Sequence, residues 1–190
     1  RFVPAKTALL IVDMQRVFVD PKGSSYLPAS APLRGRLKDL LTAWRAKNLP
    51  VFFTRHLHKQ PTLDGGAMAR WWRSLIRDGS FDAQLLEELA PRSEEPVLTK
   101  NRYSAFVGTS LEAMLRAAGV EALLIAGVMT HLCCEATARD AFMKDFDVFV
   151  LGDGTASVDA CLHLSSLCTL AHGFGRVLGV DEALEIIETP

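Results

Sequence analysis

Three side chains that could act together in covalent catalysis each follow an apolar run of this 190-residue sequence. Asp13 directly follows the run Thr7–Val12, Lys100 follows a shorter run, and Cys133 comes a few residues after Ala122–Gly127. A thiolate can attack a carbonyl carbon, and a carboxylate can take the thiol proton and later return it to a leaving group. The combination indicates hydrolysis of a small molecule through a cysteine nucleophile.

Cys133 lies where a buried strand is expected to turn into a helix. We expect Thr130 to cap this helix, which puts the Cys133 sulfur in the first helical turn. The free N–H groups and the helix dipole there favour a thiolate, and the same groups could bind an oxyanion. Cys133 and Cys134 could instead both be small buried core residues. The spacing does not say which of the two faces the crevice.

Asp13 and Lys100 indicate a catalytic role only when they are considered together. Alone, Asp13 could cap a turn, and Lys100 could be a solvated loop residue. A lysine placed beside Asp13 keeps the carboxylate ionised and lowers the pKa of a nearby thiol. Asp153, in a Gly-Asp-Gly-Thr turn, is expected to be structural.

The histidines are less informative. His56 and His58 form a His-x-His pattern after a strand, but two ligands are too few for a metal site and no third ligand has an obvious spacing. We therefore interpret them as ordinary loop or rim residues, and we expect no metal or cofactor. His131 stands two residues from Cys133 and therefore points away from it on a helix.

Aromatic side chains could wall a small-molecule pocket, since such pockets are lined in this way. They are Phe18, Trp71, Trp72, Tyr103 and Phe106. Beside the tryptophans, Arg70 and Arg73 could meet a substrate carboxylate or remain solvated.

Strand-like and helix-like patterns alternate along the chain, which predicts parallel βαβ units. We expect a three-layer α/β/α sandwich around a parallel sheet, in one domain spanning residues 1–190. Predicted strands are Thr7–Val12, Leu49–Thr54, Pro96–Thr99, Ala122–Gly127, Val148–Leu151 and Phe174–Leu178. Predicted helices are Leu33–Lys47, Phe81–Leu89, Ser110–Ala118, His131–Lys144, Val158–Leu170 and Glu182–Ile187.

Ligands bind such sheets at the carboxyl ends of the strands, where Asp13, Lys100 and Cys133 would meet. The irregular stretch from His56 to Gly79 is expected to form a lid or pocket wall.

Composition excludes several function classes. Basic residues number 21 and acidic residues 22, a net charge of −1, so the sequence carries no electrostatic signature of nucleic-acid or membrane binding. No apolar run approaches the roughly 18 residues of a membrane helix, and no secretory leader is visible. The four cysteines lack metal-type spacing, which favours free thiols in a reducing cytoplasm.

Three motifs together resemble the isochorismatase-like hydrolases, a superfamily that includes nicotinamidases and N-carbamoylsarcosine amidases. They are Leu10-Ile-Val-Asp-Met-Gln, Lys100-Asn-Arg-Tyr-Ser-Ala-Phe, and Gly127-Val-Met-Thr-His-Leu-Cys-Cys-Glu-Ala-Thr-Ala-Arg-Asp-Ala. The resemblance implies a six-stranded parallel sheet and places the family's triad on Asp13, Lys100 and Cys133, in preference to Cys134. It also implies a cis peptide before Met129, and an oxyanion hole from the N–H groups of Met129 and Cys133.

The same resemblance places Phe18 and the loop carrying Trp71 and Trp72 near the substrate, and it implies a homo-oligomer, either dimer or tetramer. Where nicotinamidases bind a metal through Asp-x-His, this sequence has His56-Leu-His58. Isochorismatases protonate a vinyl ether from the aspartate, and several lack the cysteine. We therefore expect a metal-independent amidohydrolase that forms a thioester on Cys133. Vinyl-ether hydrolysis with Asp13 as the acid, and a non-catalytic binding protein, are the alternatives.

Overall fold

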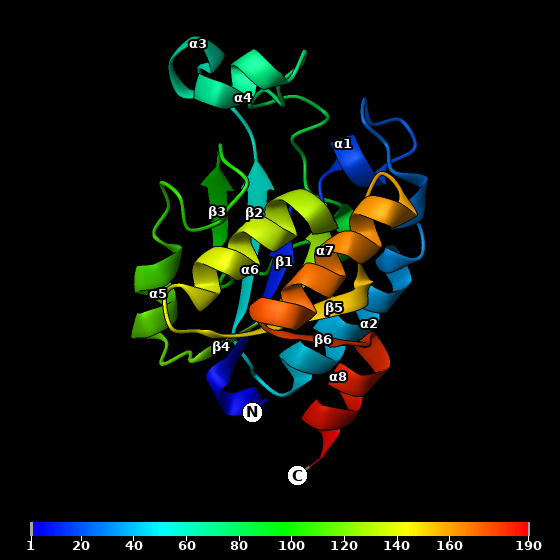
Figure 1. Ribbon diagram of the computed structural model, residues 1–190, viewed down its shortest axis with the longest axis vertical. Coiled ribbons are helices and arrows are strands. Elements are labelled where there is room, and N and C mark those ends of the chain that lie inside the picture. Colours follow the sequence, from blue (N-terminus) through cyan, green and yellow to red (C-terminus); the bar gives the residue numbers. More distant parts are fainter. Residues whose placement is uncertain (1, 190) are drawn as a thin grey trace.

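The structure, a computed structural model, describes residues 2–189, so the two ends of the predicted 1–190 domain lie outside the described residues. Its centre is a six-stranded, all-parallel sheet with the order β3-β2-β1-β4-β5-β6 (Figure 1). The strands are β1 Thr7–Val12, β2 Val51–His56, β3 Val97–Lys100, β4 Ala122–Val128, β5 Asp147–Ala156 and β6 Arg176–Leu178. The predicted α/β class and six-stranded sheet are confirmed.

Helices cover both faces of the sheet. One buried cluster joins the sheet to α2 (Leu33–Ala46) and α8 (Val180–Glu188), and the other joins it to α5 (Leu111–Ala117), α6 (Glu135–Phe142) and α7 (Ala160–Gly173). In residues 2–189 the α-helices are α1 Arg16–Val19, α2 Leu33–Ala46, α3 Pro61–Asp64, α4 Gly66–Trp71, α5 Leu111–Ala117, α6 Glu135–Phe142, α7 Ala160–Gly173 and α8 Val180–Glu188. None of the helices in this part of the chain combines the length and apolar composition that crossing a lipid bilayer requires.

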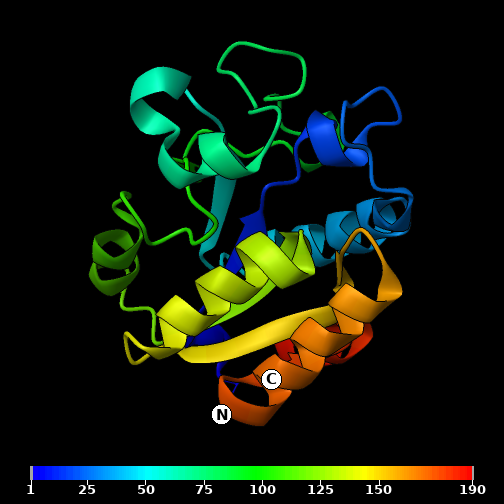
Figure 2. The same cartoon turned by 45° about the horizontal axis from the view of Figure 1, so that its top comes forward.

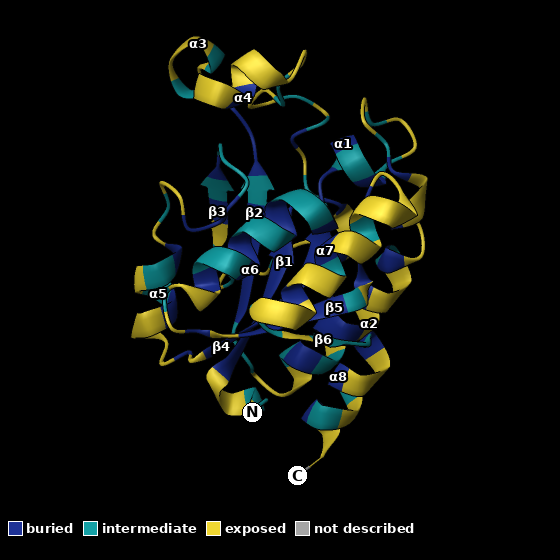
Figure 3. Cartoon of the chain, viewed as in Figure 1, coloured by how far each residue is buried: buried dark blue, intermediate teal, exposed yellow. Residues whose placement is uncertain are grey.

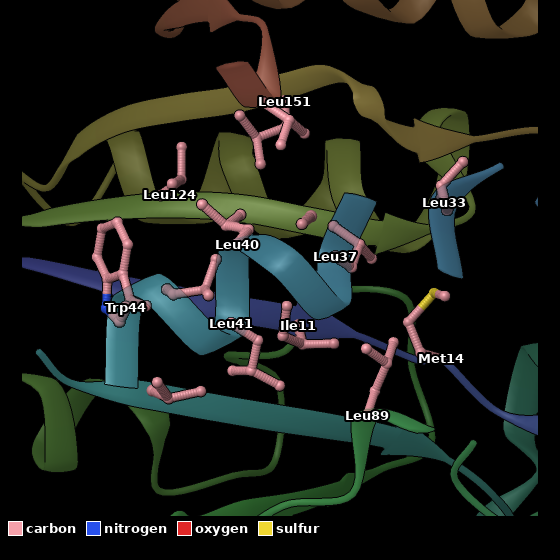
Figure 4. Packing of buried hydrophobic residues seen from close by; sticks show 14 of the residues in the cluster. Ile11, Met14, Leu33, Leu37, Leu40, Leu41, Trp44, Leu89, Leu124 and Leu151 are labelled. Carbon is pink, nitrogen blue, oxygen red and sulfur yellow. The ribbon is translucent and has the colours of Figure 1, made fainter. Parts of the chain in front are cut away.

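The apolar runs recognised in the sequence form the two cores because side chains alternate across a strand. In β1, Leu9 and Ile11 face the α2 side, and Leu10 faces the α5 and α6 side. Leucines spaced three or four residues apart in α2 lie over the first face, as Figure 4 shows for Leu37 and Leu40. Burial on both faces explains why β1 reads as uniformly apolar.

One predicted helix is wrong. The segment Phe81–Leu89 forms only a short 3₁₀ turn at Glu87–Leu89. Its backbone instead pairs with the chain that follows β1: the N–H of Arg16 donates to the carbonyl of Gln84 at 2.8 Å, and the N–H of Leu86 donates to Met14 at 2.9 Å. This long-range pairing satisfies backbone groups that a helix would have satisfied locally.

Strands β1 and β4 are neighbours at the centre of the sheet, and the strands that follow them, β2 and β5, lie on opposite sides of this pair. Such a change of direction, called a topological switch point, opens a crevice at the carboxyl ends of the strands. Helices α1, α3 and α4 all lie at this end (Figures 1 and 2). Most of α3 and α4 is exposed, in contrast to the buried strands (Figure 3). The fold therefore leaves one open edge on which a ligand can meet the residues that follow β1, β3 and β4.

Candidate active site

Asp13, Lys100 and Cys133, which are far apart in the sequence, come together at the switch point. The ammonium nitrogen of Lys100 lies 2.6 Å from Asp13 Oδ2 and donates a hydrogen bond to Cys133 Sγ at 3.2 Å. The Asp13 carboxylate and the Cys133 sulfur belong to a group whose atoms all lie within 4.8 Å of one another. All three residues are buried, so each polar group depends on the others.

The end of β1 is built to direct the Asp13 carboxylate. Asp13 has a φ of 49°, in the left-handed region that aspartate tolerates better than most residues. Thr54, buried in β2, donates its hydroxyl hydrogen to Asp13 Oδ1 at 2.6 Å and accepts the Asp13 N–H at 3.2 Å. Thr54 was not among the residues predicted from the sequence to belong to the site. Its signal was a hydroxyl group near the end of an otherwise apolar run.

The end of β4 brings Cys133 close to β1. Gly127 pairs with Val12 and has a φ of 115°, and a Cβ atom there would lie 2.1 Å from the Val12 carbonyl oxygen. Only glycine permits so close an approach. The Val128–Met129 peptide bond is cis, and the chain then forms a π-helical turn over Thr130–Cys134.

The predicted Thr130 cap is wrong, because no side chain caps this turn. The Thr130 hydroxyl instead lies 2.8 Å from Nδ1 of His163 on α7. A π-helical turn starts directly after Met129, so the simple strand-to-helix junction expected from the sequence is absent.

Burial dominates the electrostatics of the thiol. It raises the pKa of Cys133 to about 12, because the lowering effect of the Lys100 ammonium does not compensate for burial and for the nearby Asp13 charge. The expected lowering of this pKa is therefore wrong. Burial also opposes the charge on Lys100, but Asp13 and Cys133 outweigh it and raise the pKa of Lys100. The resting site contains a neutral thiol beside a lysine ammonium paired with Asp13.

The two adjacent cysteines have different surroundings. Cys133 lines the cavity described below and contacts Lys100, whereas Cys134 is fully buried and does not line that cavity. Burial, followed by the neighbouring Cys133, raises the pKa of Cys134 well above its ordinary value. Among the described cysteines, Cys133 is thus the one that a ligand in this cavity can reach.

His56, interpreted from the sequence as an ordinary loop or rim residue, is the buried last residue of β2 and belongs to the site. Its Nδ1 lies 3.4 Å from the Lys100 ammonium nitrogen, and it lines the same cavity as Cys133. Gln15 fixes the backbone of His56 from both sides: Gln15 Oε1 accepts the His56 N–H at 2.6 Å, and Gln15 Nε2 donates to the His56 carbonyl at 3.0 Å. Burial, then the Lys100 charge, lowers the pKa of His56 to about 4. The ring is therefore neutral at physiological pH.

In front of Cys133 lies a cavity of about 140 Å³, close in volume to the cavity of about 150 Å³ that can hold a benzene molecule. Phe18, Tyr103 and Met129 line it, as does Trp72, whose indole N–H donates to the Tyr103 hydroxyl at 2.9 Å. Trp71, predicted to contact the substrate, does not line the cavity, and 78% of its surface is exposed.

The remaining candidates do not line this cavity. Phe106 packs into the core. His131 forms a hydrogen bond with the Ser157 hydroxyl through Nδ1, and Asp153 accepts a hydrogen bond from the Val180 N–H at 2.8 Å. His58 is buried, and its Nδ1 lies 3.0 Å from Asp64 Oδ1, so it is not an ordinary loop residue either. The expectations for His131 and Asp153 agree with these contacts.

Within residues 2–189, Asp13, His56 and Cys133 form the one group of side chains close enough to hold a metal ion. However, the Lys100 ammonium lies within 3.4 Å of an atom of each of them. A cationic group that contacts all three of these side chains would repel a metal ion, so the arrangement does not fit one.

Comparison with known proteins identifies the family. The family model of the isochorismatase domain matches residues 7–182. The chain is 38% identical over 178 residues to nicotinamidase 3 of Arabidopsis thaliana, covering 92% of this chain and 85% of that protein. It is 34% identical over 164 residues to an isochorismatase of Bacillus subtilis, covering 86% of this chain and 52% of that longer protein.

Among solved structures, a cysteine hydrolase from Pseudomonas syringae pv. phaseolicola superposes with a TM-score of 0.95 at 32% identity, covering 99% of this chain and 95% of that one. Sequence and fold agree over nearly the whole chain. The protein therefore belongs to the isochorismatase-like hydrolase family.

Proposed function

We propose that this protein hydrolyses the C–N bond of a small amide through a thioester on Cys133. The observation that carries the proposal is the contact of one ammonium group, on Lys100, with both the Asp13 carboxylate and the Cys133 sulfur, at 2.6 Å and 3.2 Å. A thiol, a carboxylate and an ammonium held together beside a cavity are the groups that acyl transfer requires.

In the first step, the Cys133 sulfur attacks the amide carbonyl carbon while Asp13 takes the thiol proton. A base is needed because the pKa of Cys133 is about 12, so few thiolates exist at neutral pH. The proton transfer moves a negative charge from the carboxylate to the sulfur. Lys100 contacts both atoms and therefore stabilises the charge before and after the transfer.

The carbonyl oxygen becomes negatively charged in the tetrahedral intermediate. We assign its stabilisation to the backbone N–H groups of Met129, which directly precedes the turn Thr130–Cys134, and of Cys133, which lies within it; both residues line the cavity. When the intermediate collapses, the C–N bond breaks and protonated Asp13 gives its proton to the departing nitrogen.

In the second step, water replaces the amine. Asp13 takes a proton from the water molecule, whose oxygen attacks the thioester carbonyl carbon. The C–S bond breaks, the carboxylic acid product leaves, and the sulfur recovers a proton from Asp13. Lys100 and His56 undergo no net change in this cycle, and they act by holding charge and position.

The family name and the Bacillus relative also support a second candidate, the hydrolysis of a vinyl ether by protonation from Asp13. This reaction does not need a nucleophilic sulfur. The two candidates therefore differ in their dependence on Cys133.

The test measures amine release from a panel of small amides, and loss of isochorismate, with the wild type and two matched variants. Cys133→Ala is expected to abolish amide hydrolysis, while Cys134→Ala, at a fully buried neighbouring position, keeps it. Isochorismate turnover that survives Cys133→Ala, without any amide hydrolysis by the wild type, would overturn the proposal in favour of vinyl-ether chemistry.

A further inference from the structure

Asp82 is the one carboxylate that lines the cavity in front of Cys133, and no lysine or arginine of the described chain lines it. The side chain is half-buried and held in place by Ser24. The Ser24 hydroxyl donates to Asp82 Oδ2 at 2.6 Å, and the Ser24 N–H donates to Oδ1 at 3.3 Å. None of the ion pairs within residues 2–189 includes Asp82.

The other charges at the site cancel. Asp13 and Lys100 form a buried pair behind Cys133 and do not line the cavity. His56 is neutral at physiological pH because its pKa is about 4. A ligand in the cavity therefore faces one uncompensated negative charge, that of Asp82.

We propose that Asp82 selects the substrate: the cavity accepts small amides whose far end is cationic or neutral, and it excludes amides whose far end is anionic. This inference rests on the proposed amide hydrolysis. Beyond that function, it specifies the charge of the substrate and the residue that discriminates between substrates by charge.

The walls of the cavity favour the same class of ligand. Phe18, Trp72 and Tyr103 present aromatic surface, which attracts cations. An anionic group would lose hydration without gaining a cationic partner, and it would also face a like charge. Arg70 and Arg73, which the sequence offered as partners for a substrate carboxylate, are exposed and do not line the cavity.

Three amides of similar size separate the possibilities: 3-aminopropanamide is cationic near neutral pH, butanamide is neutral, and succinamate is anionic. We expect kcat/KM to fall in that order for the wild type. Asp82→Asn should reduce the ratio of kcat/KM for 3-aminopropanamide to that for butanamide about fivefold. This is the change in affinity expected when a partly exposed ion pair is lost. Asp82→Lys should make succinamate the best of the three.

Asp78→Asn is the matched control. It lies in the same loop, does not line the cavity, and accepts a hydrogen bond from the Gly79 N–H that asparagine can also accept. This variant is expected to keep the wild-type order. Equal use of succinamate and 3-aminopropanamide by the wild type, or an unchanged preference in Asp82→Asn, would overturn the inference even if all three amides are hydrolysed.

Binding to the Cys133→Ala variant tests the inference without turnover. Calorimetry should give the tightest dissociation constant for 3-aminopropanamide and the weakest for succinamate, with the difference reduced by adding Asp82→Asn. Ordered binding without hydrolysis by the wild type would reject the proposed function and keep the charge selection. Binding of none of the amides, or tighter binding of succinamate, would reject the charge selection.

Discussion

The ammonium group of Lys100 lies 2.6 Å from the carboxylate of Asp13, and neither side chain has any exposed surface. A buried ion pair of this kind stabilises each partner only while the other is present, because an unpaired charge in the interior is strongly unfavourable. The pair is also the centre of the proposed chemistry, so its roles in stability and in activity must be separated by experiment.

Removing one partner should destabilise the fold more than removing both. Lys100→Met leaves the Asp13 carboxylate buried and unpaired, and we expect the free energy of unfolding to fall by about 3–5 kcal/mol. The double variant Asp13→Asn/Lys100→Met should recover most of that loss without recovering amide hydrolysis. Urea unfolding and amine release measure the two effects. A double variant as unstable as Lys100→Met would show that the charge pair is not the cause.

His56 should make the protein sensitive to acid. The unfolded chain takes up a proton at His56 near pH 6.5, whereas the folded protein resists it until about pH 4. The folded pKa is lowered, so the stability contributed by the neutral ring is complete above pH 6.5 and is lost as the pH falls towards 4. The loss is on the order of 3 kcal/mol.

Urea unfolding at pH 7 and pH 4.5 measures this contribution. His56→Gln should lose less stability between the two pH values than the wild type. His172→Gln, an exposed substitution at the end of α7, should behave like the wild type. Equal acid sensitivity of His56→Gln and the wild type would argue against a buried neutral ring.

The adjacent tryptophans should differ in their effect on the substrate. Trp72→Ala removes a wall of the cavity and the hydrogen bond to Tyr103, so we expect KM to rise roughly two- to tenfold. Trp71→Ala changes a side chain that does not line the cavity and should leave kcat and KM unchanged. A larger effect at Trp71 than at Trp72 would contradict the cavity described for residues 2–189.

Two glycine substitutions test the close approach of β1 and β4. Gly127→Ala puts a methyl group 2.1 Å from the Val12 carbonyl oxygen at a φ of 115°, which should cost roughly 2–5 kcal/mol and displace Asp13 from Cys133. Gly35→Ala, in α2 with open space around it, should instead stabilise the protein by about 0.5–1 kcal/mol. Thermal or urea unfolding compares the two. An unchanged free energy of unfolding in Gly127→Ala would mean that β1 and β4 do not approach each other so closely at this point.

The sequence was sufficient to predict the sheet and the meeting of Asp13, Lys100 and Cys133, because a strand buried on both faces has a strong local signal and all parallel strands end at one edge. It was insufficient where distant backbone pairing decides the structure. The segment Phe81–Leu89 has a helical pattern but pairs with the chain after β1, which no local periodicity reveals.

The details of the cavity were also beyond the sequence. Trp71 and Trp72 are neighbours, and a one-residue difference at the end of the short helix α4 decides which of them faces the ligand. The pKa of Cys133 depends on how deeply the sulfur is buried, which position in the sequence does not give. His56 belongs to the site because it contacts Lys100, a residue of another strand, and because it lines the same cavity as Cys133.

Direct detection of the acyl group provides the clearest test of the proposed chemistry. The wild type is mixed with the best amide of the panel, quenched with acid during turnover, digested, and analysed by peptide mass spectrometry. We expect an acyl mass on Cys133, with Cys134, Cys161 and Cys168 unmodified and with no adduct in Cys133→Ala. Amide turnover with no acyl group on Cys133, or with the group on Cys134, would contradict it.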